Sequence, residues 1–107
     1  LLVLAAADKK PVMLDFYADW CVSCKELDSF VFTDNSVRKA LQDFAVIKVD
    51  VTDNSELDQT LMQKYNIVGP PGLVFFDKQG AWLSSSTVVG VPNTSDFAQL
   101  LTTIAAQ

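Results

Sequence analysis

The chain has 107 residues, half of them apolar, and carries eight basic against thirteen acidic residues for a formal net charge of −5. This size predicts a single domain, residues 1–107, around one hydrophobic core. The acidic balance and the absence of a basic run argue against a surface for nucleic acid or anionic membrane, because both need clustered Lys and Arg.

The first residues, 1–7, are apolar but far shorter than the roughly 20 residues that cross a bilayer. They also lack the charged start and the cleavage pattern of a signal peptide. We expect a short helix over residues 1–9. Because the chain begins with Leu rather than Met, we expect a domain excised from a longer protein or a trimmed mature form.

Residues 11–18 form a nearly continuous apolar run, typical of a strand that is buried on both faces. A helix is expected over residues 22–32, where Leu27, Phe30 and Val31 recur at helical spacing. Residues 33–36 break this helix and offer caps for a short second helix over residues 37–41.

The alternation of residues 44–51 predicts a second strand. Residues 55–58 match a capping box, which opens a helix that reaches about Tyr65. The residues of this helix expected to face the core are Leu57, Leu61 and Met62.

After a turn-rich stretch, residues 73–77 predict a third strand, residues 78–80 a hairpin-like connection, and residues 84–89 a fourth strand. Residues 93–96 cap a last helix that ends at about residue 105. This order predicts an α/β fold, a mixed sheet with helices on both faces. The inward residues of the last helix are expected to be Phe97, Leu100, Leu101 and Ile104.

The only two cysteines, Cys21 and Cys24, are two residues apart where the first strand gives way to a helix. This is the pattern of a redox dithiol. Unpaired N–H groups and the helix dipole favour a thiolate at Cys21, which we expect to be the more exposed sulfur. Cys21 suits the attacking thiolate and Cys24 the sulfur that resolves the mixed disulfide.

Other interpretations of the two cysteines stay open. A purely structural disulfide would close so short a loop that it would stabilise the fold little. Half of a zinc site lacks ligands, because the chain has no His and no further Cys. Haem attachment would need His in place of Lys25. A Cu(I) chaperone would bind metal rather than catalyse, and tight copper binding by the reduced domain would favour it.

Three segments, residues 10–26, 51–52 and 69–77, resemble the thioredoxin superfamily. Within it they are similar to the C-terminal, periplasmic domains of DsbD-type thiol:disulfide interchange proteins. The resemblance extends over nearly the whole chain from Lys10. It implies the thioredoxin fold, a central mixed β-sheet flanked by helices on both faces.

The resemblance also implies a reductant, a protein-disulfide reductase that relays electrons by dithiol–disulfide exchange. The electrons would pass from a membrane-embedded domain to the N-terminal domain of the same kind of protein, through transient mixed disulfides. The domain would be periplasmic, monomeric when isolated, and without a metal or small-molecule cofactor, because the cysteines carry the electrons. A free-standing periplasmic reductase for cytochrome c maturation is the alternative within this class.

Asp15 lies in the middle of a buried strand, where a carboxylate is costly and its pKa should be raised. The resemblance implies that it accepts the proton when Cys24 attacks; an Asp hydrogen-bonded to backbone at a strand edge is the alternative. Asp28 lies on the helical face of Cys24, and the family carries an acidic residue there. With Asp19 and Glu26 it would raise the thiol pKa and favour a reductant, unless these are ordinary solvated charges.

Pro71 corresponds to the proline that is cis and lies beside the cysteines in this superfamily, where the preceding backbone pairs with an extended substrate. Here Pro70 has no N–H to donate, and Gly72 stands where Thr is common. A rigid Pro-Pro turn without a partner role is the alternative. The expected docking residues are Trp20, Val22, Pro70, Pro71 and Gly90.

Overall fold

The computed structural model describes residues 9–107, so the helix expected over residues 1–9 lies outside the described part. A four-stranded mixed sheet has the order β2-β1-β3-β4. β1 (Val12–Tyr17) runs parallel to β2 (Ala45–Asp50) and antiparallel to β3 (Gly72–Phe76). β4 is a short antiparallel strand, Val88–Val89, beside β3. The predicted α/β sheet is therefore confirmed, with β1 at its centre.

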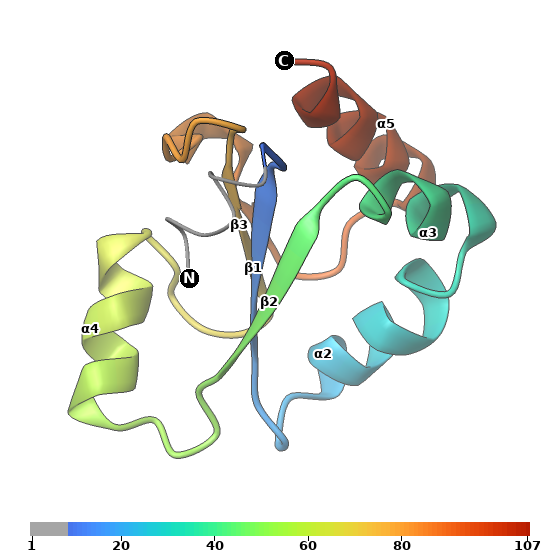
Figure 1. Ribbon diagram of the computed structural model, residues 1–107. Helices are drawn as coiled ribbons and strands as arrows, with labels where there is room; N and C mark the ends of the chain where they lie inside the picture. The colour runs from blue at the N-terminus through green and yellow to red at the C-terminus, as the bar shows by residue number, and fades with distance from the viewer. Residues whose placement is uncertain (1–8) are drawn as a thin grey trace.

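Helices cover both faces of the sheet (Figure 1). α4 (Glu56–Lys64) lies on one face. The other face carries α2 (Val22–Glu26), its π-helical continuation η1 (Leu27–Val31), α3 (Asn35–Leu41) and α5 (Thr94–Ala105). This arrangement is the thioredoxin fold. None of the helices described between residues 9 and 107 is both long enough and apolar enough to traverse a bilayer.

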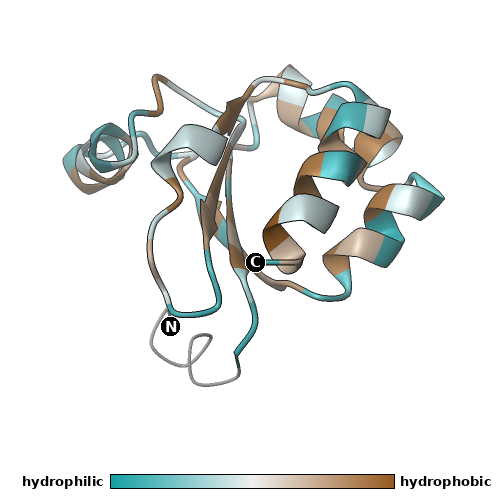
Figure 2. Cartoon of the chain, turned by 90° about the horizontal axis from the view of Figure 1, so that it is seen from above, coloured by the Kyte–Doolittle hydropathy of each residue, from teal (hydrophilic) through white to brown (hydrophobic). Residues whose placement is uncertain are grey.

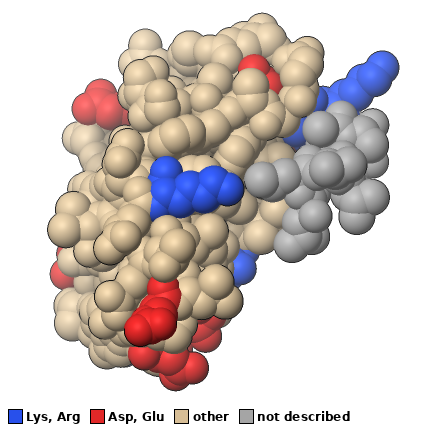
Figure 3. All heavy atoms as spheres, turned by 90° about the vertical axis from the view of Figure 1, so that its left-hand side faces the viewer, with Lys and Arg blue, Asp and Glu red and all other residues tan. Residues whose placement is uncertain are grey.

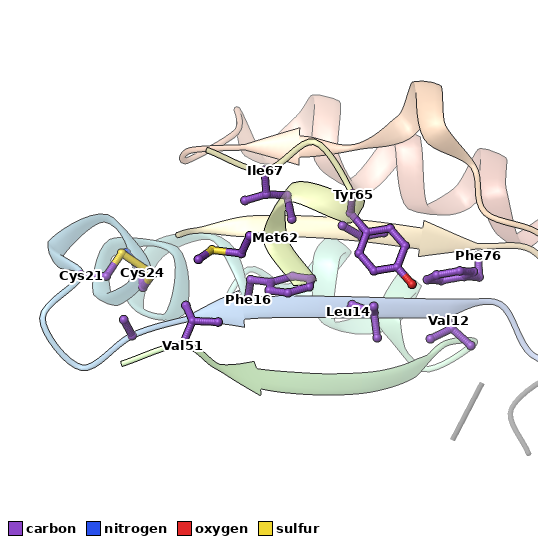
Figure 4. Packing of buried hydrophobic residues seen from close by; sticks show 12 residues of the cluster. Val12, Leu14, Phe16, Cys21, Cys24, Val51, Met62, Tyr65, Ile67 and Phe76 are labelled. Atoms are coloured by element: carbon purple, nitrogen blue, oxygen red, sulfur yellow. A yellow bond between two sulfur atoms is a disulfide. The ribbon is translucent and has the colours of Figure 1, made fainter. Parts of the chain in front are cut away.

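The alternation of β1 divides the core into two layers. Even-numbered residues point toward α4, and Met13 points toward the opposite helices. In Figure 2 much of the central sheet is brown, and α5, the helix that ends at C, turns apolar residues toward the sheet. The α4 layer, shown in part in Figure 4, contains Val12, Leu14, Phe16, Val74, Met62, Tyr65 and both cysteines. The other layer contains Met13, Leu27, Val31, Val37, Leu73, Phe75, Phe97, Leu101 and Ile104.

Side-chain caps fix the starts of three helices. Asp34 accepts hydrogen bonds from two amides of α3, and Asn93 does the same for α5. Ser55 and Asp58 form the expected capping box on α4, each accepting from the backbone amide of the other. The polar residues that precede each of these helices in the sequence thus determine where the helix begins, because their side chains accept hydrogen bonds from backbone amides that would otherwise be unpaired.

Two expected apolar contacts are wrong. Phe30 is 73% exposed, because it lies inside the π-helical turn, where residues four and five apart share a face rather than residues three apart. Phe32, five residues after Leu27, packs near Phe97 instead, with ring centroids 6.2 Å apart. Leu57 is 76% exposed. α4 contacts the core through its second half, at Leu61 and Met62, and its C-cap residue Tyr65 also packs there, whereas Leu57 lies in the first turn.

The fourth strand is much shorter than the expected 84–89. Residues Ser84–Ser86 form a 3₁₀ turn, η2, in which the Ser86 amide donates to the Leu83 carbonyl. Three consecutive serines favour such local hydrogen bonding over a strand ladder. Only Val88–Val89 pairs with β3.

Candidate active site

A disulfide joins Cys21 to Cys24 at the start of α2, with Cα atoms 5.3 Å apart. Cys21 is the N-cap of this helix, and its Sγ accepts a hydrogen bond from the Cys24 amide at 3.1 Å. The two side chains are 5% and 4% exposed, so the expected difference in exposure is absent, because both sulfurs lie against the α4 layer of the core. What distinguishes Cys21 from Cys24 is the hydrogen bond that its Sγ accepts from the helix amide of Cys24, because such a bond stabilises a thiolate.

Asp15 lies in β1 on the side of α2 and is only 2% exposed. Burial raises the pKa of its carboxyl from 3.8 to about 6; the Lys48 ammonium opposes this shift and the Asp28 carboxylate adds to it. Lys48 is the register partner of Asp15 on β2. Within residues 9–107 no hydrogen bond to the Asp15 carboxylate is present, which disfavours an Asp held by the backbone. A carboxyl with this pKa can exchange a proton near neutral pH.

The four acidic residues singled out in the sequence are not equivalent. Asp28 is exposed, yet close enough to Asp15 to raise its pKa. Asp19 and Glu26 are exposed on the surface beside the cysteines. The structure therefore pairs Asp28 electrostatically with Asp15 and leaves Asp19 and Glu26 in solvent.

Thr52 anchors the segment before the cysteines, a role that the sequence did not reveal. Its hydroxyl accepts a hydrogen bond from the Asp19 amide at 3.0 Å, and its carbonyl accepts from Trp20 Nε1 at 2.9 Å. The hydroxyl of Thr52 donates in turn to the Asp50 carboxylate, which also accepts from the Thr52 amide. These bonds lower the pKa of Asp50. The only sequence signal was the similarity of residues 51–52 to the family.

The Pro70–Pro71 peptide bond is cis, as the resemblance implied. Pro71 is buried and its carbonyl accepts a hydrogen bond from the Gly90 amide at 3.1 Å, so this carbonyl already has a partner. A β-carbon on Gly72 would lie 2.7 Å from Ile67 Cδ1. The glycine in place of the common Thr is therefore required by the position of Ile67.

Several exposed apolar side chains lie next to the cysteines in the sequence or in the segments around the cis Pro70–Pro71 bond. Gly90 has φ +91°, which lets the loop turn at this point. The exposed side chains are Trp20 at 57%, Val22 at 69%, Val68 at 96% and Val89 at 53%. Of the expected docking residues, Trp20 and Val22 are thus accessible, Pro70 is half-buried, and Pro71 is buried. Among the described residues, no group of three or more His, Cys, Asp or Glu side chains could hold a metal ion.

A fold of this kind with a disulfide at the start of α2 defines a class of enzyme, the thiol:disulfide oxidoreductases with protein-disulfide reductase activity. The family model of the thioredoxin-like domain matches residues 2–105, and the chain belongs to this family. It is 43% identical over 99 residues, 92% of its length, to the thiol:disulfide interchange protein DsbD of Yersinia pestis. It is 51% identical over 76 residues, 71% of its length, to the DsbD of Ralstonia nicotianae.

The chain spans 17% of the length of the Yersinia protein and 12% of the Ralstonia protein. Among solved structures, the oxidised C-terminal domain of Neisseria meningitidis DsbD matches with a TM-score of 0.79 and 31% identity, over 96% of this chain and 89% of that one. A thioredoxin from Thermus thermophilus matches with a TM-score of 0.78 and 30% identity, over 96% and 79% of the two chains. The chain is thus similar to a redox domain of DsbD.

Proposed function

We propose that residues 1–107 form one redox domain of a DsbD-type protein and relay electrons from a membrane-embedded domain to a periplasmic partner domain. The observation that carries the proposal is the Cys21–Cys24 disulfide at the start of α2, in a chain whose strand β1 also holds the buried carboxyl of Asp15. The similarity to DsbD over 92% of the chain supports it. The domain would act in the periplasm, through transient mixed disulfides with these protein partners.

In the proposed reaction, the Cys21 thiolate of the reduced domain attacks a partner disulfide and forms a mixed disulfide, releasing one partner thiolate. Cys24 then loses its proton and attacks Cys21 Sγ, which releases the second partner thiolate and leaves the Cys21–Cys24 disulfide. Asp15 accepts the proton of Cys24. Its raised pKa suits this role, because a carboxylate with a pKa of about 6 is a stronger base than an exposed one.

Electron donation, rather than oxidation of partners, is favoured by the acidic surroundings. The charges of Asp15 and Asp28, together with Asp19 and Glu26, disfavour a thiolate and so destabilise the reduced form. The α4 side of the molecule, opposite the face that carries η1 and Asp28, also has acidic atoms at its lower end (Figure 3), the end at which β1 stops in Figure 1. The hydrogen bond from the Cys24 amide to Cys21 Sγ acts in the opposite direction.

Docking would use the exposed apolar side chains around the disulfide. Trp20 and Val22 flank the cysteines in the sequence, and the cis Pro70–Pro71 segment and Gly90 would form the opposite wall. Pro70 has no N–H, and the Pro71 carbonyl is taken by the Gly90 amide. Backbone pairing with a partner is therefore limited to the Pro70 carbonyl, and apolar contact supplies the remainder of the binding.

The test is the reduction potential of Cys21–Cys24 against glutathione or thioredoxin, followed by Trp20 fluorescence. We expect a potential near roughly −270 mV and a Cys21 pKa at or above about 8.5, measured by alkylation rates. A couple near −120 mV with an acidic thiol would contradict the proposal. In a second experiment, Cys24→Ser should trap a mixed disulfide with the oxidised N-terminal domain of a DsbD-type protein, and Cys21→Ser should not.

A further inference from the structure

Val68 is the most exposed large apolar side chain between residues 9 and 107, at 96%. A single exposed valine is ordinary on a protein surface. Val68 is unusual because the chain is held in place on both sides of it, by the end of α4 before it and by Pro71 after it. The segment therefore presents this side chain to solvent in a fixed position.

The first anchor is the end of α4. The Asn66 amide donates to the Gln63 carbonyl at 3.1 Å, and Asn66 has φ +62°. The Ile67 amide donates to the Met62 carbonyl at 2.9 Å. These are the hydrogen bonds of a Schellman C-cap, in which the second residue past the helix end packs back on the last turn. Ile67 is accordingly buried, with its side chain against the position that a β-carbon on Gly72 would take.

The second anchor is Pro71. It is buried, and its carbonyl accepts a hydrogen bond from the Gly90 amide at 3.1 Å. The next residue, Gly72, already pairs with β1 and β4. Between the two anchors lie residues 68–70. A β-carbon added to Gly69 would have no heavy atom within 4 Å apart from its chain neighbours, so this short span projects from the surface.

Val68 lies at the end of the sheet that carries the disulfide. The register of β3 on β1, extended by one residue, puts Pro71 beside Tyr17, the last residue of β1. The Cys21 amide donates to the Ala18 carbonyl, one residue beyond that strand, so the cysteines follow at the same end. The Cα atom of Val68 is at most about 10 Å from that of Pro71, because three residues span no more than this.

This separation decides which partners contact Val68. An interface between two proteins usually covers a patch about 30 Å across, so a partner domain whose disulfide meets Cys21 also reaches the chain next to Pro71. A small disulfide such as oxidised glutathione contacts little beyond the two sulfur atoms. A contact at Val68 would therefore favour protein disulfides over small ones.

The surroundings of Val68 indicate the chemistry of the partner surface. The pocket at its base is lined on the α4 side by polar, uncharged side chains, among them Asn54, Gln59 and Gln63. An apolar side chain within a polar surround has the composition of a small interface core and its rim. A charged partner group placed against Val68 would lose hydration without finding a counter-charge. The matching partner surface is therefore apolar.

We propose that Val68 is a specificity-determining residue that inserts into an apolar depression on the partner domain, beside the disulfide that the partner brings to Cys21. The inference rests on the proposed function, since it requires a protein partner at Cys21–Cys24. Because both anchors hold Val68 before binding, the complex forms without the entropic cost of ordering this loop.

The test compares a protein disulfide with a small one. The substrates are the oxidised N-terminal domain of a DsbD-type protein and oxidised glutathione, and the second-order rate constant for reduction of each is measured with the reduced domain. Val68→Ala removes two methyl groups. We expect it to lower the ratio of the protein rate constant to the glutathione rate constant by roughly 10-fold, the loss typical of two buried methyl groups.

Val46→Ala is the matched control. It makes the same truncation at a 43% exposed valine of β2, which is the register partner of Met13 near the other end of β1. This variant should keep the ratio of the wild-type domain. An unchanged ratio in Val68→Ala, or an equal fall in Val46→Ala, would overturn the proposal.

Methyl NMR tests the contact in a domain that keeps Val68. In the mixed disulfide trapped by Cys24→Ser, the Val68 methyl signals should become protected from a soluble paramagnetic probe, and those of Val46 should stay accessible. Val68 methyl groups as accessible as in the free domain would contradict the insertion. Failure of the reduced domain to form any mixed disulfide with the N-terminal domain would instead contradict the proposed function, so the two failures are distinguishable.

Discussion

The side chain of Ile67 occupies the volume that a β-carbon on residue 72 would need, with Cδ1 at 2.7 Å and Cγ2 at 2.9 Å from that position. Gly72 is the first residue of β3 and is buried against β1. Its φ is not in the left-handed region, so the backbone itself would accept other residues. The neighbour, rather than the backbone, requires glycine here.

Gly72→Ala should therefore destabilise the oxidised domain by about 1–3 kcal/mol, the usual cost of overpacking a core. Ile67→Ala should also destabilise, but Gly72→Ala should cost much less in its presence, because the side chain that clashes has been removed. A double-mutant cycle from urea unfolding measures this coupling, which we expect to be on the order of 1 kcal/mol. Strict additivity of the two changes would show that the contact does not constrain residue 72.

Gly90 and Gly69 form a matched pair, because neither has an atom within 4 Å of an added β-carbon. They differ in backbone conformation: only Gly90 has φ in the left-handed region, at +91°. Gly90→Ala should cost roughly 1–2 kcal/mol, whereas Gly69→Ala should be neutral or slightly stabilising. Thermal unfolding of both variants checks this, and equal effects would argue against strain at Gly90.

The raised pKa of Asp15 makes the stability of the domain depend on pH. Since the folded pKa is about 6 and the unfolded value 3.8, the folded state binds the extra proton between these values. The free energy of unfolding should therefore fall as pH rises from 4 to 6, by up to roughly 3 kcal/mol. Asp15→Asn removes this titration and should stabilise the oxidised domain most at pH 7, while slowing the release of the partner.

Urea unfolding of the wild type and Asp15→Asn from pH 4 to 8 tests this prediction. Asp50 gives a control of opposite sign, because its pKa is lowered by the hydrogen bonds from Thr52. Its contribution to stability is present above its unfolded pKa and is lost as pH falls, so Asp50→Asn should destabilise at neutral pH and less in acid. A difference between wild type and Asp15→Asn that does not change with pH would contradict the assignment.

Thr52→Val removes the hydroxyl that joins Asp19 to Asp50 while keeping the shape of the side chain. We expect a loss of about 1–2 kcal/mol in stability and a lower kcat/KM for protein disulfides, because the Asp19 amide, next to Trp20, loses its acceptor. The hydrogen bond from Trp20 to the Thr52 carbonyl is kept. Thr103→Val is the control, since the Thr103 hydroxyl donates to the Gln99 carbonyl one turn earlier, on the exposed face of α5. If the two variants lost stability and activity equally, the proposed anchoring role of Thr52 would be wrong.

The longer elements were predictable because their signals are local. β1 is an apolar run, α4 opens with a capping box, and α5 has both a cap and a regular apolar stripe. The π-helical turn Leu27–Val31 was not predictable, because one extra residue in a helical turn leaves no change of composition, and Phe30 was misplaced as a result. The three serines of η2 were misassigned because strand-forming apolar residues flank them, Trp82 and Leu83 before and Val88 and Val89 after.

The residues of the candidate site also fall into those that the sequence predicted and those that it did not. The cysteines, the buried Asp15 and the Pro70–Pro71 bond carry signals in their own residue types. The anchoring role of Thr52 could not be predicted from its residue type, because its hydrogen bonds with Asp19 and Trp20 join residues that are 33 and 32 positions apart in the sequence. The packing of Ile67 against Gly72 likewise depends on how a loop meets a strand, which only the folded chain determines.

The indole of Trp20 combines two properties that rarely occur together: it is 57% exposed, yet its Nε1 is hydrogen-bonded to the Thr52 carbonyl. An exposed side chain ordinarily samples several rotamers, and a partner must restrict it at an entropic cost of about 0.5–1.5 kcal/mol. Here that restriction is present before binding. Under the proposed function, a partner that docks beside the disulfide would meet an aromatic surface that is already ordered, and less entropy would be lost on binding.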